Sequence, residues 1–298
     1  MLQNLFEIEA RKSVGQPTLL ILDDVADSFD YKNKYAIIEY LSDLSLDPNI
    51  YLLILTHNFD FYRTITSRLN VGSNIFFAHK NEVRDVQFKM GLYKPDILAK
   101  RFLEKYTERR ALIGCIPFVR NLIEYTKGTD DQGYITLTKC LHLKDNTSVL
   151  TFREISEVLQ NNIQKINAEN VPFGDELYLN ALFEEAELIL ADDNEVDIVN
   201  KVVLCMAIRL KAEIYMKGIL TETQLLEMKP NRNQSGELVK TLKKYHMVDK
   251  ENECLILGRV LMLTSENIHL NNFMFEPLVD ISILYLKSLY NQCKNELR

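Results

Sequence analysis

The segment TLLILDDVADSFD, residues 18–30, decides how this chain is expected to fold. An unbroken apolar run, Leu19 to Leu22, leads directly into two adjacent carboxylates, Asp23 and Asp24. A short apolar run that ends in acids is typical of a buried strand whose last residues reach a polar rim. One carboxylate there could hold Mg²⁺ while the second positions or deprotonates a water. The alternative is that the two acids merely end the strand and cap the next helix.

The residues around this run alternate between helix and strand patterns. We expect helices over residues 2–12, 31–46 and 58–69, and strands over 18–23, 50–55 and 74–79. Strands that alternate with helices predict a parallel sheet covered on both faces, with ligands at the carboxyl ends of the strands. Residues 1–92 are therefore expected to form an α/β lobe.

After about residue 95 the pattern changes to long amphipathic helices. Residues 93–298 are therefore expected to form a mostly helical domain, so that the fold class is α/β followed by mainly α. The expected helices cover 95–126, 151–168, 175–191, 196–217, 235–246 and 276–296, with short strands considered at 134–137 and 254–257.

Composition narrows the class of protein. The chain has 298 residues and a formal net charge of −7, which gives no global electrostatic case for binding nucleic acid. Its five cysteines lie far apart and form no CxxC, which indicates reduced thiols in a cytoplasmic protein. No apolar run approaches the length of a membrane helix, so no membrane partner is expected.

A second apolar strand ends at His57, within YLLILTHNFDFYR, residues 51–63. Together with LLILDDVADSFD, this resembles the Walker B strand, D-loop and switch histidine of ABC-class ATPases. The resemblance implies that Asp23 organises Mg²⁺ and that Asp24 occupies the place of the catalytic Glu. It also implies that Ser28 and Asp30 belong to the D-loop, which crosses to a partner protomer. His57 would touch the γ-phosphate, although a histidine at a strand end can also be purely structural.

The acid pair, ADSFDYKNKYAIIEYL and ILTHNFDFYRT are similar to SMC/RecF-like AAA ATPases of bacterial phage defence, including relatives of the anticodon-nuclease ATPases. The specific motifs cover roughly residues 1–80, and residues 266–282 resemble the C-terminal end of such proteins. This resemblance implies ATP and Mg²⁺ as cofactors and a homodimer of the full protein. It also implies an effector protein or nucleic acid as partner, in phage defence or a DNA-related process.

One departure from this family concerns phosphate binding. The chain carries no GxxxxGK[ST], the loop whose backbone and Lys cradle the phosphates, and the signature motif is also missing. We therefore expect a partial P-loop NTPase lobe that depends on a missing N-terminal ATPase lobe or a partner protomer. Alone, the chain is expected to bind ATP weakly or not at all. Asp24 is one methylene shorter than Glu, which predicts slow turnover even in a complete assembly.

Two other functions stay open. The chain could be a non-enzymatic interaction scaffold with a degenerate nucleotide site. It could also be a metal-independent RNase centred on Arg120, Glu124 and His142, since anticodon-nuclease relatives carry an Arg-x-x-x-Glu pair and a later His. His would then act as acid and base, Arg would hold the phosphate and Glu would orient them. The simpler interpretation is an ordinary i,i+4 ion pair and an unrelated histidine.

Overall fold

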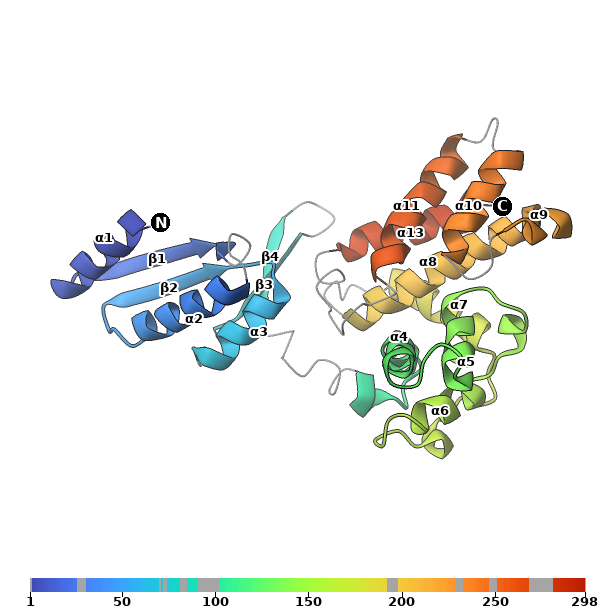
Figure 1. Cartoon of the computed structure of the whole chain (residues 1–298), viewed down its shortest axis with the longest axis horizontal. Helices are drawn as coiled ribbons and strands as arrows, with labels where there is room; N and C mark the ends of the chain where they lie inside the picture. The colour runs from blue at the N-terminus through green and yellow to red at the C-terminus, as the bar shows by residue number, and fades with distance from the viewer. Residues whose placement is uncertain are drawn as a thin grey trace. The chain divides into compact units, whose positions relative to one another are not determined.

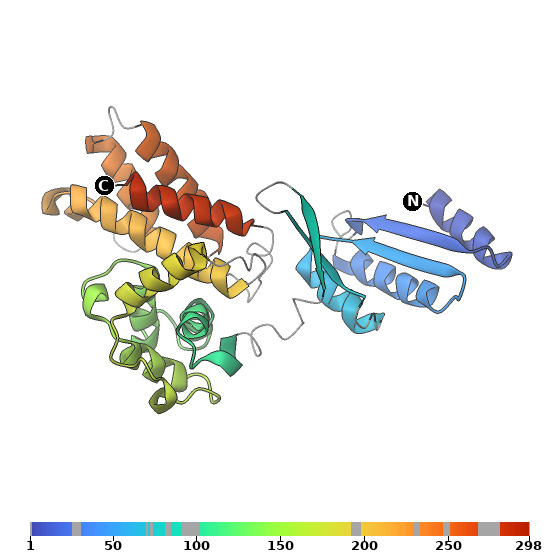
Figure 2. The same cartoon turned by 180° about the vertical axis from the view of Figure 1, so that it is seen from behind.

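The computed structural model describes residues 2–25, 31–69, 71, 74–80, 85–90, 102–191, 198–228, 233–246, 251–267 and 281–297. The chain divides into two compact units (Figures 1 and 2). One unit comprises Met1–Ala78 with Gln87–Pro95, and the other comprises His79–Val86 with Asp96–Arg298. This order is compatible with the expected α/β part followed by a helical part.

The first unit contains a small parallel sheet. Its elements in chain order are α1 (Leu2–Ser13), β1 (Thr18–Asp23), α2 (Tyr31–Ser45), β2 (Ile50–Leu55) and α3 (Phe59–Arg68). The two strands pair in parallel, with a register that runs from Thr18 opposite Ile50 to Asp23 opposite Leu55. Both strands have the bounds predicted from the sequence. Because they are parallel and in register, their carboxyl ends lie side by side.

Helices cover one face of this sheet. Ile8 of α1, the buried side of α2 and two residues of α3 form one apolar core with the inward face of β1 and β2. The opposite face is open: Leu19, Ile21, Tyr51 and Leu53 are between 45% and 60% exposed. The expectation of a sheet covered on both faces is therefore wrong for the described residues, because the three helices contribute to a single core.

The third predicted strand does not join this sheet. β3 (Phe76–Lys80) pairs instead with β4 (Val86–Met90) in a separate two-stranded sheet. The β4 strand was not predicted, although its sequence, VQFKM, alternates between apolar and polar residues as a half-buried strand does. The ring of Phe77 lies edge-on to Tyr62 of α3, with ring centroids 5.7 Å apart.

The second unit is helical. Its helices are α4 (Arg109–Thr126), α5 (Gln132–Leu141), α6 (Phe152–Gln160), α7 (Tyr178–Leu190), α8 (Ile198–Ile219), α9 (Glu222–Leu226), α10 (Gln234–His246), α11 (Glu251–Asn267) and α13 (Ile283–Asn295). The α8 helix is central and contacts α4, α5, α7, α10, α11 and α13 (Figure 1). Burial on all sides explains why its sequence is apolar around most of the helix.

Several predicted boundaries need correction. The strands considered at 134–137 and 254–257 are wrong, because these residues lie inside α5 and α11. Asp131 caps α5 by accepting hydrogen bonds from the backbone N–H groups of Gly133 and Tyr134, so the short β-branched run that follows continues as helix. The α4 helix begins only at Arg109, after a 3₁₀ turn at Leu103–Lys105.

The described residues bear on two features of the composition, the apolar helices and the cysteines. None of the helices in the described ranges combines the length and the apolar character needed to cross a lipid bilayer. All five cysteines are free thiols, and four of them are buried.

Candidate functional site

Asp24 and His57 meet where β1 and β2 end. Oδ1 of Asp24 lies 2.9 Å from Nδ1 of the His57 ring and also accepts a hydrogen bond from the His57 backbone N–H at 3.3 Å. The Asp24 backbone N–H donates to the carbonyl of Leu55 at 3.0 Å. Of the side chains predicted to converge at one rim of the sheet, Asp24 and His57 are therefore in contact, and Asp23 lies at the end of β1 beside them.

The local backbone conformation orients the side chains of Asp24 and His57. Asp24 has a left-handed backbone with φ of 45°, a conformation that Asp tolerates better than most residues, and the chain turns sharply there. On the other side, Thr56 accepts from the backbone of Asn58 at 3.1 Å, and Asn58 caps α3 by accepting from Phe61 at 2.9 Å. These bonds hold the loop that presents His57.

The pair is accessible to solvent. The side chains of His57 and Asp24 are 54% and 45% exposed, and Asp23 is exposed as well. An ionised carboxylate can only accept, so Nδ1 of His57 carries the proton and Nε2 is directed away from Asp24. An exposed pair of this kind contributes at most about 1 kcal/mol to stability.

The carboxylates fit one kind of metal site. Within the described residues, no group of three or more His, Cys, Asp or Glu side chains could hold a metal ion. Mg²⁺ is commonly bound through one or two carboxylates together with phosphate oxygens and waters. Adjacent exposed acids at a strand end, Asp23 and Asp24, fit a magnesium ion that arrives with a phosphate, and they do not fit an all-protein metal cage.

The two remaining predicted nucleotide contacts, Ser28 and Asp30, lie outside the described residues. The catalytic, magnesium and phosphate roles of Asp24, Asp23 and His57 stay predictions, since the geometry places these residues without testing what they do.

The alternative RNase residues form a different environment. Arg120 pairs with Glu124 at 2.8 Å, as the i,i+4 spacing predicts, and also bonds to Asn121 at 2.9 Å and to the hydroxyl of Tyr134. However, Arg120 is only 5% exposed while the Glu124 side chain is 38% exposed, so the ion pair is half-buried, with its guanidinium inside the helical unit. A guanidinium with so many intramolecular partners leaves little surface for a phosphodiester.

His142 is held by a buried carboxylate. Its Nδ1 lies 2.8 Å from Oε1 of Glu213, and only 7% of His142 is exposed. Arg209 approaches the other side of the ring, with Nη1 3.5 Å from Nε2. Burial, with a smaller contribution from the neighbouring Arg120 guanidinium, lowers the pKa of Arg209 to about 10, although Glu213 acts in the opposite direction.

Sequence reasoning missed Glu213 and Arg209. The available signal was their position in the middle of IVNKVVLCMAIRLKAEIYMKGI, where charged residues interrupt a helix that is otherwise apolar around most of its circumference. Charged side chains inside such a helix are expected to find partners in the core.

Comparisons with known proteins give a distant relationship. The chain is 24% identical over 128 residues to the methionine import ATP-binding protein MetN of Coxiella burnetii. The match covers 43% of this chain and 34% of MetN, so the chain spans about a third of that relative's length. No protein-family profile matches the chain, and no solved structure is similar to it. This similarity is to an ABC-type ATP-binding protein, and it is weak.

Proposed function

We propose that residues 1–92 form one half of a composite ABC-type ATP site, and that nucleotide state sets the position of the helical part, residues 93–298. The observation that supports this most directly is the contact between Asp24 and His57 at the ends of two parallel strands, next to Asp23. The weak similarity to MetN points to the same class of protein.

Each residue has a distinct role in this proposal. Asp23 would hold Mg²⁺, which neutralises charge on the phosphates when it is bound. Asp24 would orient the attacking water and accept its proton, and its hydrogen bond would keep the His57 ring in one tautomer. That tautomer directs Nε2 outward, where it would contact the γ-phosphate. Ser28 and Asp30 would complete the site across an interface.

The rest of the site would come from outside residues 1–298, either from an N-terminal ATPase lobe or from a partner protomer. Since the chain has no GxxxxGK[ST], the phosphate-cradling loop must be supplied by an N-terminal ATPase lobe or a partner protomer. The coupling to an effector protein or to nucleic acid, in phage defence or another DNA-related process, is the part of this proposal that rests on resemblance alone.

The test uses Asp24→Asn in the assembly that purifies with a tagged copy of the chain. Asn tolerates the left-handed backbone and keeps the side-chain volume, but it cannot accept a proton, so ATP turnover should fall at least a hundredfold. Asp43→Asn, an exposed aspartate of α2, is the matched control and should turn over normally. Unchanged turnover of Asp24→Asn would remove Asp24 from the mechanism.

Calorimetric titration of the isolated chain with Mg-ATP accompanies this test. No binding in the micromolar range is expected, because the loop that supplies most of the phosphate contacts is absent. Micromolar binding would contradict the composite site. An assembly that forms normally and never hydrolyses ATP would favour the scaffold function.

A further inference from the structure

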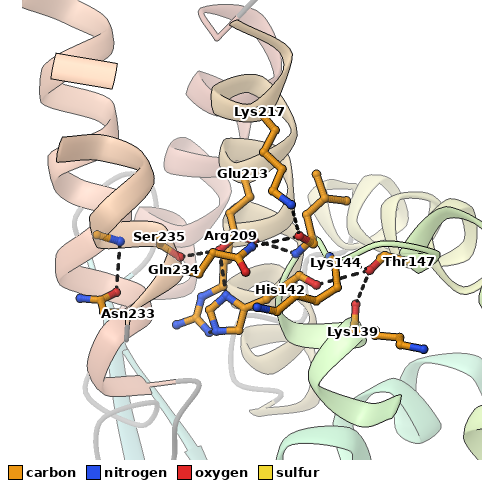
Figure 3. Close-up of polar contacts among 12 residues, drawn as sticks. Lys139, His142, Lys144, Thr147, Arg209, Glu213, Lys217, Asn233, Gln234 and Ser235 are labelled. Atoms are coloured by element: carbon orange, nitrogen blue, oxygen red, sulfur yellow. Dashed lines mark hydrogen bonds and ion pairs between the residues drawn. The ribbon is translucent and has the colours of Figure 1, made fainter. Parts of the chain in front are cut away.

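Glu213 is a fully buried carboxylate that joins two segments of the helical unit (Figure 3). From the turn after α5, Nδ1 of His142 lies 2.8 Å from Oε1, and the backbone N–H of Leu143 donates to Oε2 at 2.7 Å. From the start of α10, the Ser235 hydroxyl donates to Oε1 at 2.6 Å, and the Gln234 amide donates to Oε2 at 2.8 Å. The carboxylate therefore fastens both segments to α8.

A second set of bonds holds the same turn. Nζ of Lys217 and the side-chain amide of Gln234 both donate to the carbonyl of Leu143, at 2.6 and 3.0 Å. The Thr147 hydroxyl donates to the carbonyl of Lys139 at 3.1 Å (Figure 3). The first residues of α10 thus contact the turn both directly and through Glu213.

The His142 ring is arranged for the neutral form. Because Glu213 accepts from Nδ1, the remaining nitrogen, Nε2, is an acceptor that faces the guanidinium of Arg209 at 3.5 Å. A second proton would place an N–H on Nε2, so that two donors and two positive charges would face each other. The negative charge of Glu213 favours a charged His142 ring, but the same charge also stabilises the neighbouring Arg209 guanidinium.

Burial and the neighbouring cations also favour the neutral ring. Burial lowers the pKa of His142; Glu213 opposes this shift, and Arg209 and Lys144 add to it. The elements around the ring contribute Arg209, Glu213 and Lys217 from α8, Lys144 and Asp145 from the turn, Lys139 from α5, and the uncharged Gln234 and Ser235 from α10.

We propose that the Glu213–His142 cluster is an acid-sensitive latch, which holds the start of α10 and the turn after α5 on α8 and opens when His142 takes up a second proton. An opened turn exposes the imidazole to water, where its charged form is no longer penalised. The latch involves none of the residues assigned to the ATP site. A test of the latch is therefore independent of a test of the proposed function.

Hydrogen exchange of the full chain tests the latch at pH 7.5 and pH 5.5. If opening lets the ring titrate near its ordinary pKa of about 6.5, the opening constant rises about tenfold between these pH values. Protection factors, which remove the pH dependence of intrinsic exchange, should fall by this factor in residues 142–149 and at the start of α10. Protection in α7 should not change.

His142→Asn is the decisive variant, because the Asn amide can still donate to Glu213 but cannot titrate. It should lose the tenfold pH effect, whereas His246→Gln, at the far end of α10, should keep it. A tenfold effect that persists in His142→Asn, or a wild-type chain without it, would overturn the latch.

Ser235→Ala keeps the proposal testable if His142→Asn does not fold. Removing one α10 bond should raise opening at both pH values and leave the tenfold ratio intact. A loss of protection that spreads equally to α7 would show general acid unfolding and would also overturn the proposal.

Discussion

Two carboxylates in this protein each contact a histidine, and burial makes them different. Oδ1 of Asp24 lies 2.9 Å from Nδ1 of His57, and both side chains are exposed. Oε1 of Glu213 lies 2.8 Å from Nδ1 of His142, and the Glu213 side chain has no exposed surface. Separating the exposed pair costs at most about 1 kcal/mol, because water replaces each partner. Removing a partner of the buried pair costs about 3–5 kcal/mol, because a charge is left unpaired in the core. The same kind of contact therefore contributes little to stability in one place and much in the other.

We expect Glu213 to make the helical unit sensitive to strong acid. Burial alone would raise the pKa of Glu213, but hydrogen bonds from His142, Ser235 and the Leu143 backbone lower it overall. Because the folded pKa lies below the unfolded value, this stabilisation is fully present above about pH 4.3 and is lost as pH falls through the folded pKa.

The variant Glu213→Gln tests this in urea denaturation between pH 3 and pH 7. It should lower the free energy of unfolding at pH 7 by about 2–4 kcal/mol and flatten its dependence on pH below 4.5. Glu251→Gln, an exposed residue of α11, should match the wild type. Equal slopes for wild type and Glu213→Gln would mean that other carboxylates cause the acid sensitivity.

At the scale of elements, close packing sets where the helices of the second unit can lie. Gly114 in α4 allows the buried ring of Phe102 to approach, and that ring packs edge-on against Phe118 with centroids 5.3 Å apart. A Cβ on Gly114 would lie 2.4 Å from the Phe102 ring. The Phe102 ring is therefore packed against α4 by a contact that only Gly permits.

Gly114→Ala should accordingly destabilise the helical unit. Ala normally favours a helix over Gly by about 1 kcal/mol, but displacing a buried ring costs about 1–3 kcal/mol, so the clash should outweigh the gain. The control is Gly258→Ala in α11, where a Cβ would meet nothing within 4 Å, and it should stabilise by about 0.5–1 kcal/mol. Denaturant midpoints measure both; a more stable Gly114→Ala would show that Phe102 moves freely.

For the molecule as a whole, the open sheet face is the feature that most needs explanation. The strands β1 and β2 are apolar on both faces, which is typical of strands buried on both sides, yet helices cover only one. A two-stranded sheet with an exposed apolar face is marginal by itself. This agrees with the proposal that an N-terminal ATPase lobe or a partner protomer completes the first unit.

Paired substitutions on the two faces test this view. Ile21→Thr with Leu53→Thr, on the open face, should change the free energy of unfolding by less than about 1 kcal/mol and reduce the binding of a hydrophobic dye. Leu20→Thr with Leu52→Thr, on the covered face, should cost about 2–4 kcal/mol. Equal costs for the two pairs would show that the open face is covered in solution.

The sequence by itself determined α1, β1, α2, β2 and α3 of the first unit and the meeting of Asp24 with His57. Apolar runs bounded by Gly, Pro and acids specify β1 and β2, and parallel pairing brings the ends of neighbouring strands together. The rhythm of apolar residues also located most helices of the second unit, although their ends differ by several residues.

Tertiary structure alone decided which faces are covered and which charges are buried. The spacing of apolar residues along the chain cannot show that β3 pairs with β4 and not with the sheet of β1 and β2, because strand pairing depends on tertiary contacts. Spacing also cannot show that His142 contacts Glu213, 71 positions later in the chain, and not Arg120 or Glu124. A charged residue in a central helix acquires its partner only when other helices close around it.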